Sequence, residues 1–242
     1  MKIILNGANG KMGKEIEKLA EAKGVDIVAK VDVTNENGYR HIGEVSEKAD
    51  CIIDFSHHLA TAEICEYVKK TGTAVIFAAT GQTEEEKEMI SACSRYAPVF
   101  FSANMSVGVA LLIELAKKAA AAMPDADIEI VEAHHNRKLD APSGTALMLA
   151  EALKQVRSKA KFVLGRSGHA KREKDDIGIS SIRMGNIVGM HEVIIGTDAQ
   201  TITIKHEAHS RALFAEGAIS AAEFLIKQPV GLYTMQNMIA DK

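Results

Sequence analysis

Histidine, arginine and lysine side chains gather near the middle of the chain, in the run Glu132-Ala133-His134-His135-Asn136-Arg137-Lys138. An imidazole exchanges a proton near neutral pH, and a neighbouring ammonium or guanidinium group holds an anion through charge-assisted hydrogen bonds. These residue types therefore predict a site that binds a small carboxylate and also moves a proton.

The flanking residues predict a strand, a loop and a helix that would position this cluster. Residues 128–131 alternate apolar and polar side chains, as a strand does, whereas the apolar spacing of residues 146–153 indicates a helix with Ser143 as its N-cap. The first N–H groups of a helix have no intrahelical acceptor, so those of Gly144 and Thr145 should face an anion that the helix dipole favours. Gly144 has no Cβ atom, which would let a ligand reach the backbone.

The same residues also have an ordinary structural interpretation. Adjacent histidines on a strand point to opposite faces, so His134 or His135 can be a buried packing residue, and Arg137 and Lys138 can be solvated loop charges. We favour the functional interpretation, because basic groups that converge on a helix N-terminus are a more specific pattern than any one of them. We expect no metal site, since no Cys, Asp or Glu accompanies the histidines at zinc-ligand spacing.

A second pattern lies at the start of the chain, where strand-like residues 1–5 precede a loop with Gly7, Gly10 and Gly13 and a helical pattern at 14–22. The glycines are one position away from the commonest dinucleotide fingerprint. A second strand pattern ends at Asp32, about 20 residues after the glycines, where a carboxylate would meet the ribose hydroxyls of a dinucleotide. The alternative is a glycine turn without a ligand. The full order of strand, loop, helix, strand and acid favours a nucleotide site.

Strand and helix patterns continue to alternate through the first hundred residues. This alternation predicts an α/β protein with a doubly wound, parallel, Rossmann-type sheet, whose ligands lie at the carboxyl ends of the strands. Those ends are Gly7–Gly13, Asp32, Phe55–Ser56, Ala78–Gly81 and Ser102–Met105, and we expect them to line one cofactor cleft.

The pattern changes after Gly108, where a second, α+β domain with an open mixed or antiparallel sheet is predicted. Strands at 177–183, 187–195 and 201–207 are closely spaced, which favours antiparallel pairing among them. Residues 165–176 are polar and predict a long loop. A helix at 211–227 should pack back on the first domain. We expect residues 1–105 and 212–242 to form the dinucleotide-binding domain and residues 106–211 a domain for substrate binding and oligomerisation.

Composition excludes several classes of protein. The chain has 242 residues, 47% of them hydrophobic, and a formal net charge of -3, whereas a nucleic-acid binder usually has a basic excess. No apolar run is long enough to span a membrane, and Asn6 and Lys11 interrupt any signal-peptide core. Cys51, Cys65 and Cys93 form no close pair, which favours reduced thiols and a cytoplasmic location.

The motifs together resemble the dihydrodipicolinate reductase family. The similarity rests on His134-His135-x-x-Lys138-x-Asp140-Ala141-Pro142-Ser143-Gly144-Thr145-Ala146, and it extends to the glycine loop, Asp54-Phe55-Ser56, residues 103–108 and residues 189–192. The chain has His57-His58-Leu59 where family members often have a proline, and Ala78-Ala79-Thr80-Gly81 where they have Gly-Thr-Thr-Gly.

The resemblance implies reduction of 4-hydroxy-tetrahydrodipicolinate, a small dicarboxylate, to tetrahydrodipicolinate by NADH or NADPH in lysine biosynthesis, in a homotetramer. By position, it implies that His134 and Lys138 handle the proton and that His135, Gly144 and Thr145 hold the substrate. It also implies a set of dinucleotide-binding residues: Gly7, Ala8, Asn9, Gly10, Lys11, Met12, Asp32, Ala78, Ala79, Thr80, Ser102, Ala103, Asn104 and Met105.

Three questions stay open from the sequence. Either His134 or Lys138 can be the proton donor. Asp32 favours NADH because a carboxylate repels a 2′-phosphate, although Lys11 or Arg40 can offset that repulsion, so both cofactors with a preference for NADH are expected. The alternatives to this reductase are another two-domain NAD(P)-dependent oxidoreductase, or a dinucleotide-binding sensor without catalytic activity.

Overall fold

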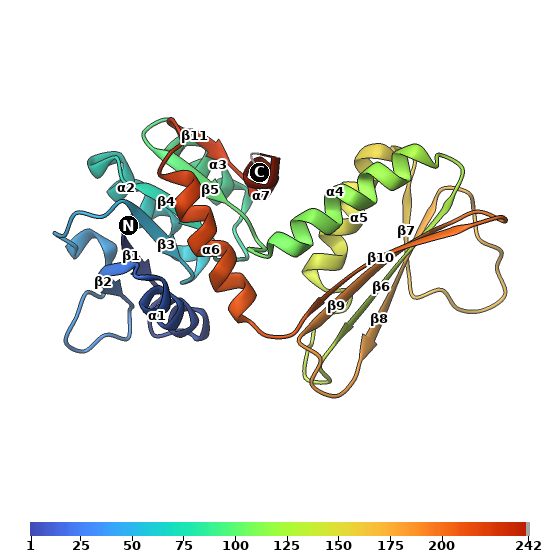
Figure 1. The fold of residues 1–242 in the computed structure, drawn as a ribbon, viewed down its shortest axis with the longest axis horizontal. Coiled ribbons are helices and arrows are strands. Elements are labelled where there is room, and N and C mark those ends of the chain that lie inside the picture. Colours follow the sequence, from blue (N-terminus) through green and yellow to red (C-terminus); the bar gives the residue numbers. More distant parts are fainter. Residues whose placement is uncertain (241–242) are drawn as a thin grey trace. The chain divides into compact units, whose positions relative to one another are not determined.

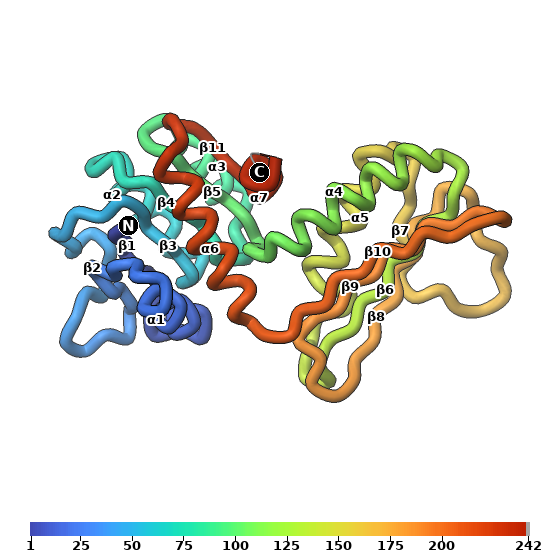
Figure 2. The backbone as a smooth tube through the Cα atoms, viewed as in Figure 1, coloured from blue at the N-terminus to red at the C-terminus, as the bar shows by residue number. Residues whose placement is uncertain are grey.

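The computed structural model describes residues 1–240. Contacts between Cα atoms divide the chain into two units, Met1–Val107 joined by the chain from Arg211 onward, and Gly108–Ser210. The boundaries expected from the sequence, at 105/106 and 211/212, lie close to these. Figures 1 and 2 show the path of the chain through each unit.

The first unit contains a six-stranded sheet with the order β11-β5-β4-β3-β1-β2. All of its pairings are parallel, which confirms the predicted sheet. The four inner strands, β1, β3, β4 and β5, are short apolar runs that are largely buried on both faces, as parallel sheets require; Ile3, Ile4 and Leu5 of β1 are fully buried. The strands are β1 (Lys2–Asn6), β2 (Asp26–Val31), β3 (Cys51–Asp54), β4 (Ala74–Phe77), β5 (Pro98–Phe101) and β11 (Gly231–Tyr233).

Helices alternate with these strands along the chain. They are α1 (Lys11–Lys23), α2 (Thr61–Thr71), α3 (Glu84–Cys93), α6 (Ala212–Leu225) and α7 (Met235–Ala240), with 3₁₀ turns η1 (Ile42–Glu44) and η2 (His58–Ala60). Helix α3 begins with a capping box, because Thr83 Oγ accepts a hydrogen bond from Glu86 N at 3.2 Å while the Glu86 carboxylate accepts one from Thr83 N at 2.8 Å.

Helix α6 returns to the first unit and contacts α1, β3, β4 and β5, as the sequence predicted. Gly217 permits this close packing, since a Cβ atom there would overlap the carbonyl oxygen of Met105. The same segment supplies β11, which extends the sheet at β5 and was not predicted from the sequence.

The second unit contains a five-stranded mixed sheet with the order β10-β9-β6-β8-β7 and the helices α4 (Val107–Ala122) and α5 (Gly144–Val156). Its strands are β6 (Asp127–His134), β7 (Lys161–Leu164), β8 (Asp176–Arg183), β9 (Gly189–Gly196) and β10 (Thr201–Ala208). Strand β8 runs parallel to β6 and β7, whereas β9 runs antiparallel to both β6 and β10.

The expected antiparallel pairing of β8 with β9 is therefore wrong. Strand β6 lies between them, although β8 and β9 follow each other in the chain. The physical reason is burial: Ile130 of β6 is completely buried between Ile179 of β8 and Val193 of β9, its register partners on the two sides. A central position for β6 pairs both of its edges, which a β8–β9 hairpin would prevent.

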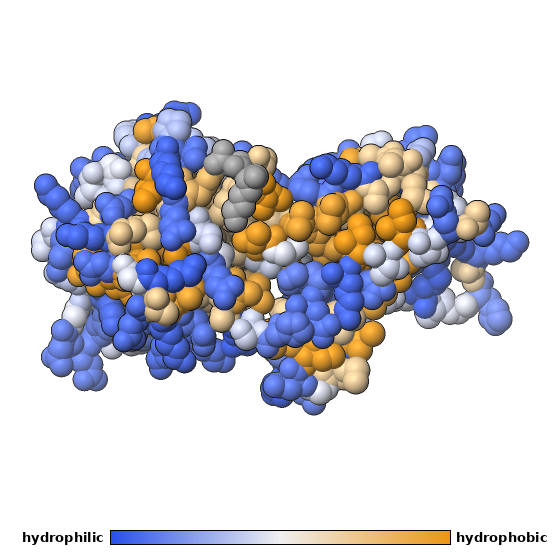
Figure 3. Space-filling view, in the orientation of Figure 1, coloured by the Kyte–Doolittle hydropathy of each residue, from blue (hydrophilic) through white to orange (hydrophobic). Residues whose placement is uncertain are grey.

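Alternate residues give the second sheet two different faces. Ile128, Ile130, Ile177, Ile179, Val193 and Ile195 form one core with apolar residues of α4 and α5. The opposite face carries the partly buried side chains of Val131, Met190 and Ile194. Helix α4 also exposes Leu111 and Leu115, and Figure 3 shows apolar surface along this helix.

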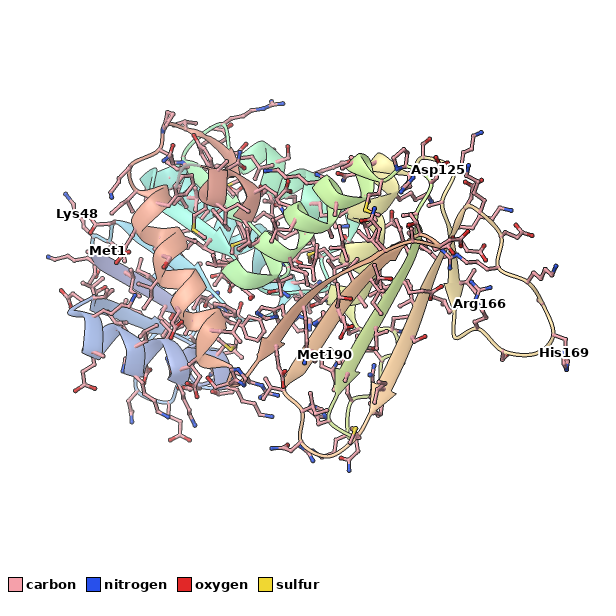
Figure 4. All side chains as sticks on the ribbon, turned by 45° about the vertical axis from the view of Figure 1, so that its right-hand side comes forward. Met1, Lys48, Asp125, Arg166, His169 and Met190 are labelled. Atoms are coloured by element: carbon pink, nitrogen blue, oxygen red, sulfur yellow. The ribbon has the colours of Figure 1, made fainter. Side chains whose placement is uncertain are left out.

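The polar segment between β7 and β8 forms the predicted loop, at the end of the sheet opposite His134. Figure 4 shows Arg166 and His169 on it. Arg166 forms an ion pair with Asp176 at 3.1 Å, and Lys174 forms one with Asp125 at 2.8 Å. Within residues 1–240, no helix has the length and apolar character needed to cross a membrane.

Candidate active site

His134 is the last residue of β6, and its Nδ1 atom lies 2.6 Å from Oε2 of Glu132. These residues are two positions apart, so they share the face of the strand that is covered by helices. A charged carboxylate only accepts hydrogen bonds, so Nδ1 of His134 carries the proton and Nε2 is left for exchange. A Cβ atom at Gly189 would lie 3.2 Å from that Nε2, so the glycine puts no side chain against this side of the ring.

Glu132 is completely buried and is surrounded by donors. Arg183 donates to both of its oxygens, at 2.9 and 2.7 Å, and the backbone N–H of Ser143 donates to Oε1 at 3.1 Å. Burial opposes the charged form, but the hydrogen bonds from Arg183 and His134 outweigh it and hold the pKa of Glu132 at about 2. The carboxylate is therefore charged at neutral pH.

A second buried histidine lies beside the first. His191 of β9 has its ring 5.2 Å from that of His134, and its Nε2 atom lies 2.9 Å from Oγ of Ser143. Burial, together with the neighbouring His134, lowers the pKa of His191 to about 4. Burial also lowers the pKa of His134, against the opposing effect of Glu132. Both rings are consequently neutral at pH 7 in this structure.

The N-terminus of α5 has the predicted form. Ser143 is the N-cap, and its Oγ accepts a hydrogen bond from Ala146 N at 3.2 Å. Nothing lies within 4 Å of the position that a Cβ atom of Gly144 would occupy. The space in front of Gly144 is open, as an approaching anion requires.

The basic residues of the loop between β6 and α5 have different surroundings from one another. Lys138 N donates to His135 O at 3.1 Å, and Lys138 Nζ forms an ion pair with Asp140 at 2.8 Å. The Lys138 charge is near enough to contribute to lowering the pKa of both His134 and His191. His135 is only partly buried, and its Nδ1 atom has no hydrogen-bond partner in the described part of the chain. Arg137 donates a hydrogen bond to Asn186 at the surface, at 2.6 Å, which agrees with the interpretation of Arg137 as a solvated loop charge.

Gly7, Gly10 and Asp32 line a cavity of about 510 Å³ in the first unit, together with Arg40 and Leu59. Gly7 has φ +81, and a Cβ atom there would lie 2.7 Å from the backbone nitrogen of Ser56. A Cβ atom at Gly13 would overlap the carbonyl oxygens of Gly7 and Ala8. Only glycine fits these positions, as in a dinucleotide-binding turn. The residues present thus fit a dinucleotide.

Asp32 is held at the rim of this cavity. Its carboxylate accepts hydrogen bonds from Asn9 N at 3.0 Å and from Thr34 N and Oγ1 at 3.0 and 2.7 Å. Burial opposes ionisation, but these bonds lower the pKa of Asp32. Arg40 Nε donates to Val33 O at 3.0 Å, which keeps a cation beside the same cavity.

The remaining predicted dinucleotide residues are at the same edge of the sheet but do not line this cavity. Ala78, Ala79 and Thr80 follow β4, with both alanines buried, and Ser102–Met105 follow β5. Lys11 and Met12 begin α1. The His57-His58 segment, where family members often have proline, forms the turn η2, and His58 is paired with Glu86 at 2.9 Å.

Sequence reasoning missed three residues of the second unit. Glu132 was visible as a carboxylate two positions before His134 on a predicted strand, a spacing that places both on one face. His191 lay in the segment 189–192 that resembles the family, but neither His191 nor Arg183 gave a spacing signal relative to His134, because they come from strands on either side of β6.

The chain has the two units of a two-domain, dinucleotide-dependent oxidoreductase. The first is a parallel α/β unit with a glycine loop and an acid after its second strand. The second is a mixed-sheet unit with histidine and lysine near the start of a helix. Residues 1–105 match the family model of the dihydrodipicolinate reductase N-terminus, and residues 108–239 match that of its C-terminus. The chain belongs to the dihydrodipicolinate reductase family.

Individual relatives agree with this assignment. The chain is 45% identical over 246 residues to 4-hydroxy-tetrahydrodipicolinate reductase of Caldanaerobacter subterraneus subsp. tengcongensis, covering 99% of this chain and 98% of the relative. It is 42% identical over 250 residues to the reductase of Clostridium perfringens strain 13, with the same coverage. Its fold matches dipicolinate-bound dihydrodipicolinate reductase from Paenisporosarcina sp. TG-14 at a TM-score of 0.81 and 22% identity, covering 98% of each chain.

The low pKa of His191 predicts a loss of stability in mild acid. Its pKa is about 4 in the folded chain, whereas an unperturbed histidine has a pKa of 6.5, so the unfolded chain binds more protons between these values. Stability therefore falls as the pH falls from about 6.5 toward 4, and this residue should cost about 2 kcal/mol of unfolding free energy between pH 7 and pH 5. Urea unfolding at both pH values measures this difference.

His191→Gln should show a smaller loss of stability between these pH values than the wild type. His169→Gln, on the exposed loop shown in Figure 4, is the matched control and should keep the wild-type difference. Equal losses in all three proteins would contradict the assignment to His191.

Proposed function

We propose that the protein reduces 4-hydroxy-tetrahydrodipicolinate to tetrahydrodipicolinate, with loss of water, in the diaminopimelate route to lysine. The observation that carries this proposal is the arrangement in the second unit. There, Glu132 engages Nδ1 of His134, Nε2 lies beside Gly189, which has no side chain, and α5 has an open N-terminus at Gly144. The named relatives are reductases of this substrate, and the Paenisporosarcina enzyme binds dipicolinate, a planar dicarboxylate.

The N-terminus of α5 would bind a substrate carboxylate through the backbone at Gly144 and Thr145. Positive electrostatic potential at a helix N-terminus and an open approach at Gly144 both favour this contact. His135 and the Lys138 ammonium would hold the remaining negative charge. Fixed donors that hold the carboxylates also keep the ring oriented, so that only the reacting atoms need to move.

His134 and Lys138 would supply the proton for the substrate nitrogen. Burial leaves His134 neutral at pH 7, but a bound dianion raises the pKa of a nearby imidazole and opposes that effect. Lys138 already carries a proton and is held near the histidines by Asp140. A bound nicotinamide dinucleotide supplies the hydride.

NADH or NADPH would bind at the carboxyl edge of the first sheet, on the glycine loop and Asp32. Gly7 and Gly13 permit the close backbone packing of the turn on which a pyrophosphate would lie, and the Asp32 carboxylate would accept hydrogen bonds from the ribose hydroxyls. A charged Asp32 repels a 2′-phosphate, whereas Arg40 beside the same cavity attracts one. We expect both cofactors to be used, with a preference for NADH.

The second unit would also assemble four copies of the chain. The sheet face opposite α4 and α5 carries Val131, Met190, Ile194 and the exposed Ile182, and these four side chains are not part of the core that the sheet forms with the two helices. Apolar side chains on an otherwise solvated sheet face favour burial against another sheet. We expect a homotetramer built through this face.

The alternatives have less support. The named relatives cover the whole chain and are reductases of one substrate, and they give no support to another two-domain NAD(P)-dependent oxidoreductase or to a sensor without catalytic activity. Cys51, Cys65 and Cys93 are all free and buried, in keeping with a reducing, cytoplasmic environment and small-molecule partners rather than nucleic acid or membrane.

Removal of either proton-handling side chain should reduce turnover. His134→Ala and Lys138→Ala are each expected to lower kcat by roughly two to four orders of magnitude, because general acid catalysis contributes that much. NADH oxidation with enzymatically generated substrate, followed by nicotinamide absorbance, tests the function and both roles. Arg137→Ala is the control from the same loop. Intact turnover at saturation in both variants would contradict the roles.

A side chain at Gly144 should block carboxylate binding without disturbing the fold. Because nothing lies near its Cβ position, Gly144→Val is expected to raise the substrate KM at least tenfold, the result of losing about 1.4 kcal/mol of anion binding. Pyridine-2,6-dicarboxylate should compete with substrate in the wild type and bind the variant more weakly. Gln155→Val, exposed on the same helix, is the control. An unchanged KM would place the anion elsewhere.

Cofactor choice should follow the balance between Asp32 and Arg40. Paired kcat/KM measurements are expected to favour NADH modestly, and Arg40→Ala should reduce kcat/KM with NADPH more than with NADH, since a charge-assisted contact contributes about 1.5–3 kcal/mol. A tenfold or larger advantage for NADPH in the wild type, about 1.4 kcal/mol, would show that the cations outweigh Asp32.

Light scattering at micromolar concentration should give four times the mass of one chain. Ile194→Lys, which puts a charge on the open sheet face, should shift the protein toward smaller species because a desolvated, unpaired charge opposes association. Leu232→Lys, at an exposed leucine of the first unit, should leave the mass unchanged. A monomeric wild-type protein would contradict the tetramer.

A further inference from the structure

We propose that Glu132 is a positioning residue that fixes two parts of the active site at once, the imidazole of His134 and the N-terminus of α5. This inference rests on the roles proposed above for His134 and Gly144. Its basis is that a single, completely buried carboxylate has contacts on both oxygens. Oε2 accepts from His134 Nδ1 and Arg183, and Oε1 accepts from Ser143 N and Arg183.

The contact with His134 selects which ring nitrogen reacts. A neutral imidazole has one N–H, and the carboxylate holds it on Nδ1 at 2.6 Å. Nε2 is then the only nitrogen that can exchange a proton with a ligand, and it is the one beside Gly189. When Nε2 gains a proton, the same carboxylate faces the positive ring and stabilises it. Rotation of the ring would lose both effects.

The contact with Ser143 extends this control to the helix that would bind the anion. The N–H of the N-cap residue is held at 3.1 Å by Glu132, while Ser143 Oγ accepts from Ala146 N and lies 2.9 Å from His191 Nε2. Gly144 follows directly. The position of the Gly144 backbone relative to His134 is consequently set through one side chain.

Arg183 makes this arrangement possible. Its guanidinium forms two hydrogen bonds with Glu132 and donates to the carbonyl oxygens of Ile182 and Asp140. It thereby neutralises the buried carboxylate and anchors the loop that contains Lys138. The charged and titratable groups that face this centre are Arg183 from β8, His134 from β6, His191 from β9, His206 from β10, and Lys138 and Asp140 from the loop.

The proton position on His134 tests the proposal in the wild-type protein. Nitrogen-15 chemical shifts of labelled histidines at pH 7 should show a protonated Nδ1 and an unprotonated Nε2 for His134, whose signals are assigned by their loss in His134→Ala. A protonated Nε2 with a bare Nδ1 would overturn the proposal, whether or not any Glu132 variant folds.

Glu132→Gln tests the catalytic consequence. An amide presents a single acceptor oxygen to the donors of His134, Arg183 and Ser143. We therefore expect a 10- to 100-fold lower kcat, the size of effect seen for carboxylates that orient metal-bound histidines, together with a raised substrate KM and an unchanged NADH dissociation constant. The pKa of His134 in the nitrogen-15 titration should fall further, because the raising effect of Glu132 is lost. Glu132→Asp should recover part of the kcat.

The matched control is Glu129→Gln, which breaks an ion pair with Arg172 on the opposite face of the same strand. It should leave kcat, KM and the His134 titration unchanged. A Glu132→Gln protein with wild-type kcat, or with the His134 titration unchanged, would overturn the proposal.

A double variant separates this inference from the proposed function. Glu132→Gln should cause little further loss of kcat in the His134→Ala background, because the two residues act through one group. Full additivity would overturn the positioning role. If His134→Ala keeps normal turnover, the proposed role of His134 fails, whereas the nitrogen-15 measurement still decides whether Glu132 sets its tautomer.

Discussion

A charged carboxylate without solvent contact constrains the whole second unit. Glu132 has no exposed surface, and an unpaired charge in such a place would cost several kcal/mol. Its donors come from β6, β8 and the loop that precedes α5. The carboxylate is therefore satisfied only when these three segments are assembled in one arrangement. The same requirement brings a histidine and a helix N-terminus together.

The first unit depends on a different constraint, the close approach of backbone segments at the carboxyl edge of a parallel sheet. Gly7 and Gly13 lie so close to neighbouring backbone atoms that a Cβ atom at either position would overlap with them. Beneath this turn, Asn6 Nδ2 and Ser56 Oγ donate to the buried carboxyl of Asp54, at 2.9 and 2.5 Å. Steric fit and a buried polar network thus shape the loop. The Asp32 carboxylate also holds it, by accepting a hydrogen bond from Asn9 N.

The electrostatics of the second unit suit a ligand of negative charge. Two neutral histidines lie near Lys138 and Arg183, and each cation disfavours a further positive charge on His134. A dianion at the N-terminus of α5 would reverse that effect and favour protonation of the ring. In the proposed function, this arrangement would couple anion binding to proton availability. This coupling would follow from burial and charge.

Much of this organisation could be predicted from the sequence. The alternation of strand and helix patterns identified the parallel sheet, and local hydrogen-bonding chemistry identified the Ser143 cap. The motif from His134 to Thr145 identified the family and the candidate site, because chemistry-bearing residues stood close together in the chain. Glu132 was predictable in principle, since its spacing from His134 needs only the period of a strand.

Only the tertiary structure decided how distant segments pair. Strand β6 lies between β8 and β9 because its two edges and its buried isoleucines need partners on both sides, whereas chain proximity favoured a β8–β9 hairpin. Arg183 and His191 reach the site only through that strand order. Periodicity and capping depend on residues that are neighbours in the chain, so they can be predicted from the local sequence. Burial of a shared face and neutralisation of a buried charge depend on residues far apart in the chain, so they become visible only when the segments are packed.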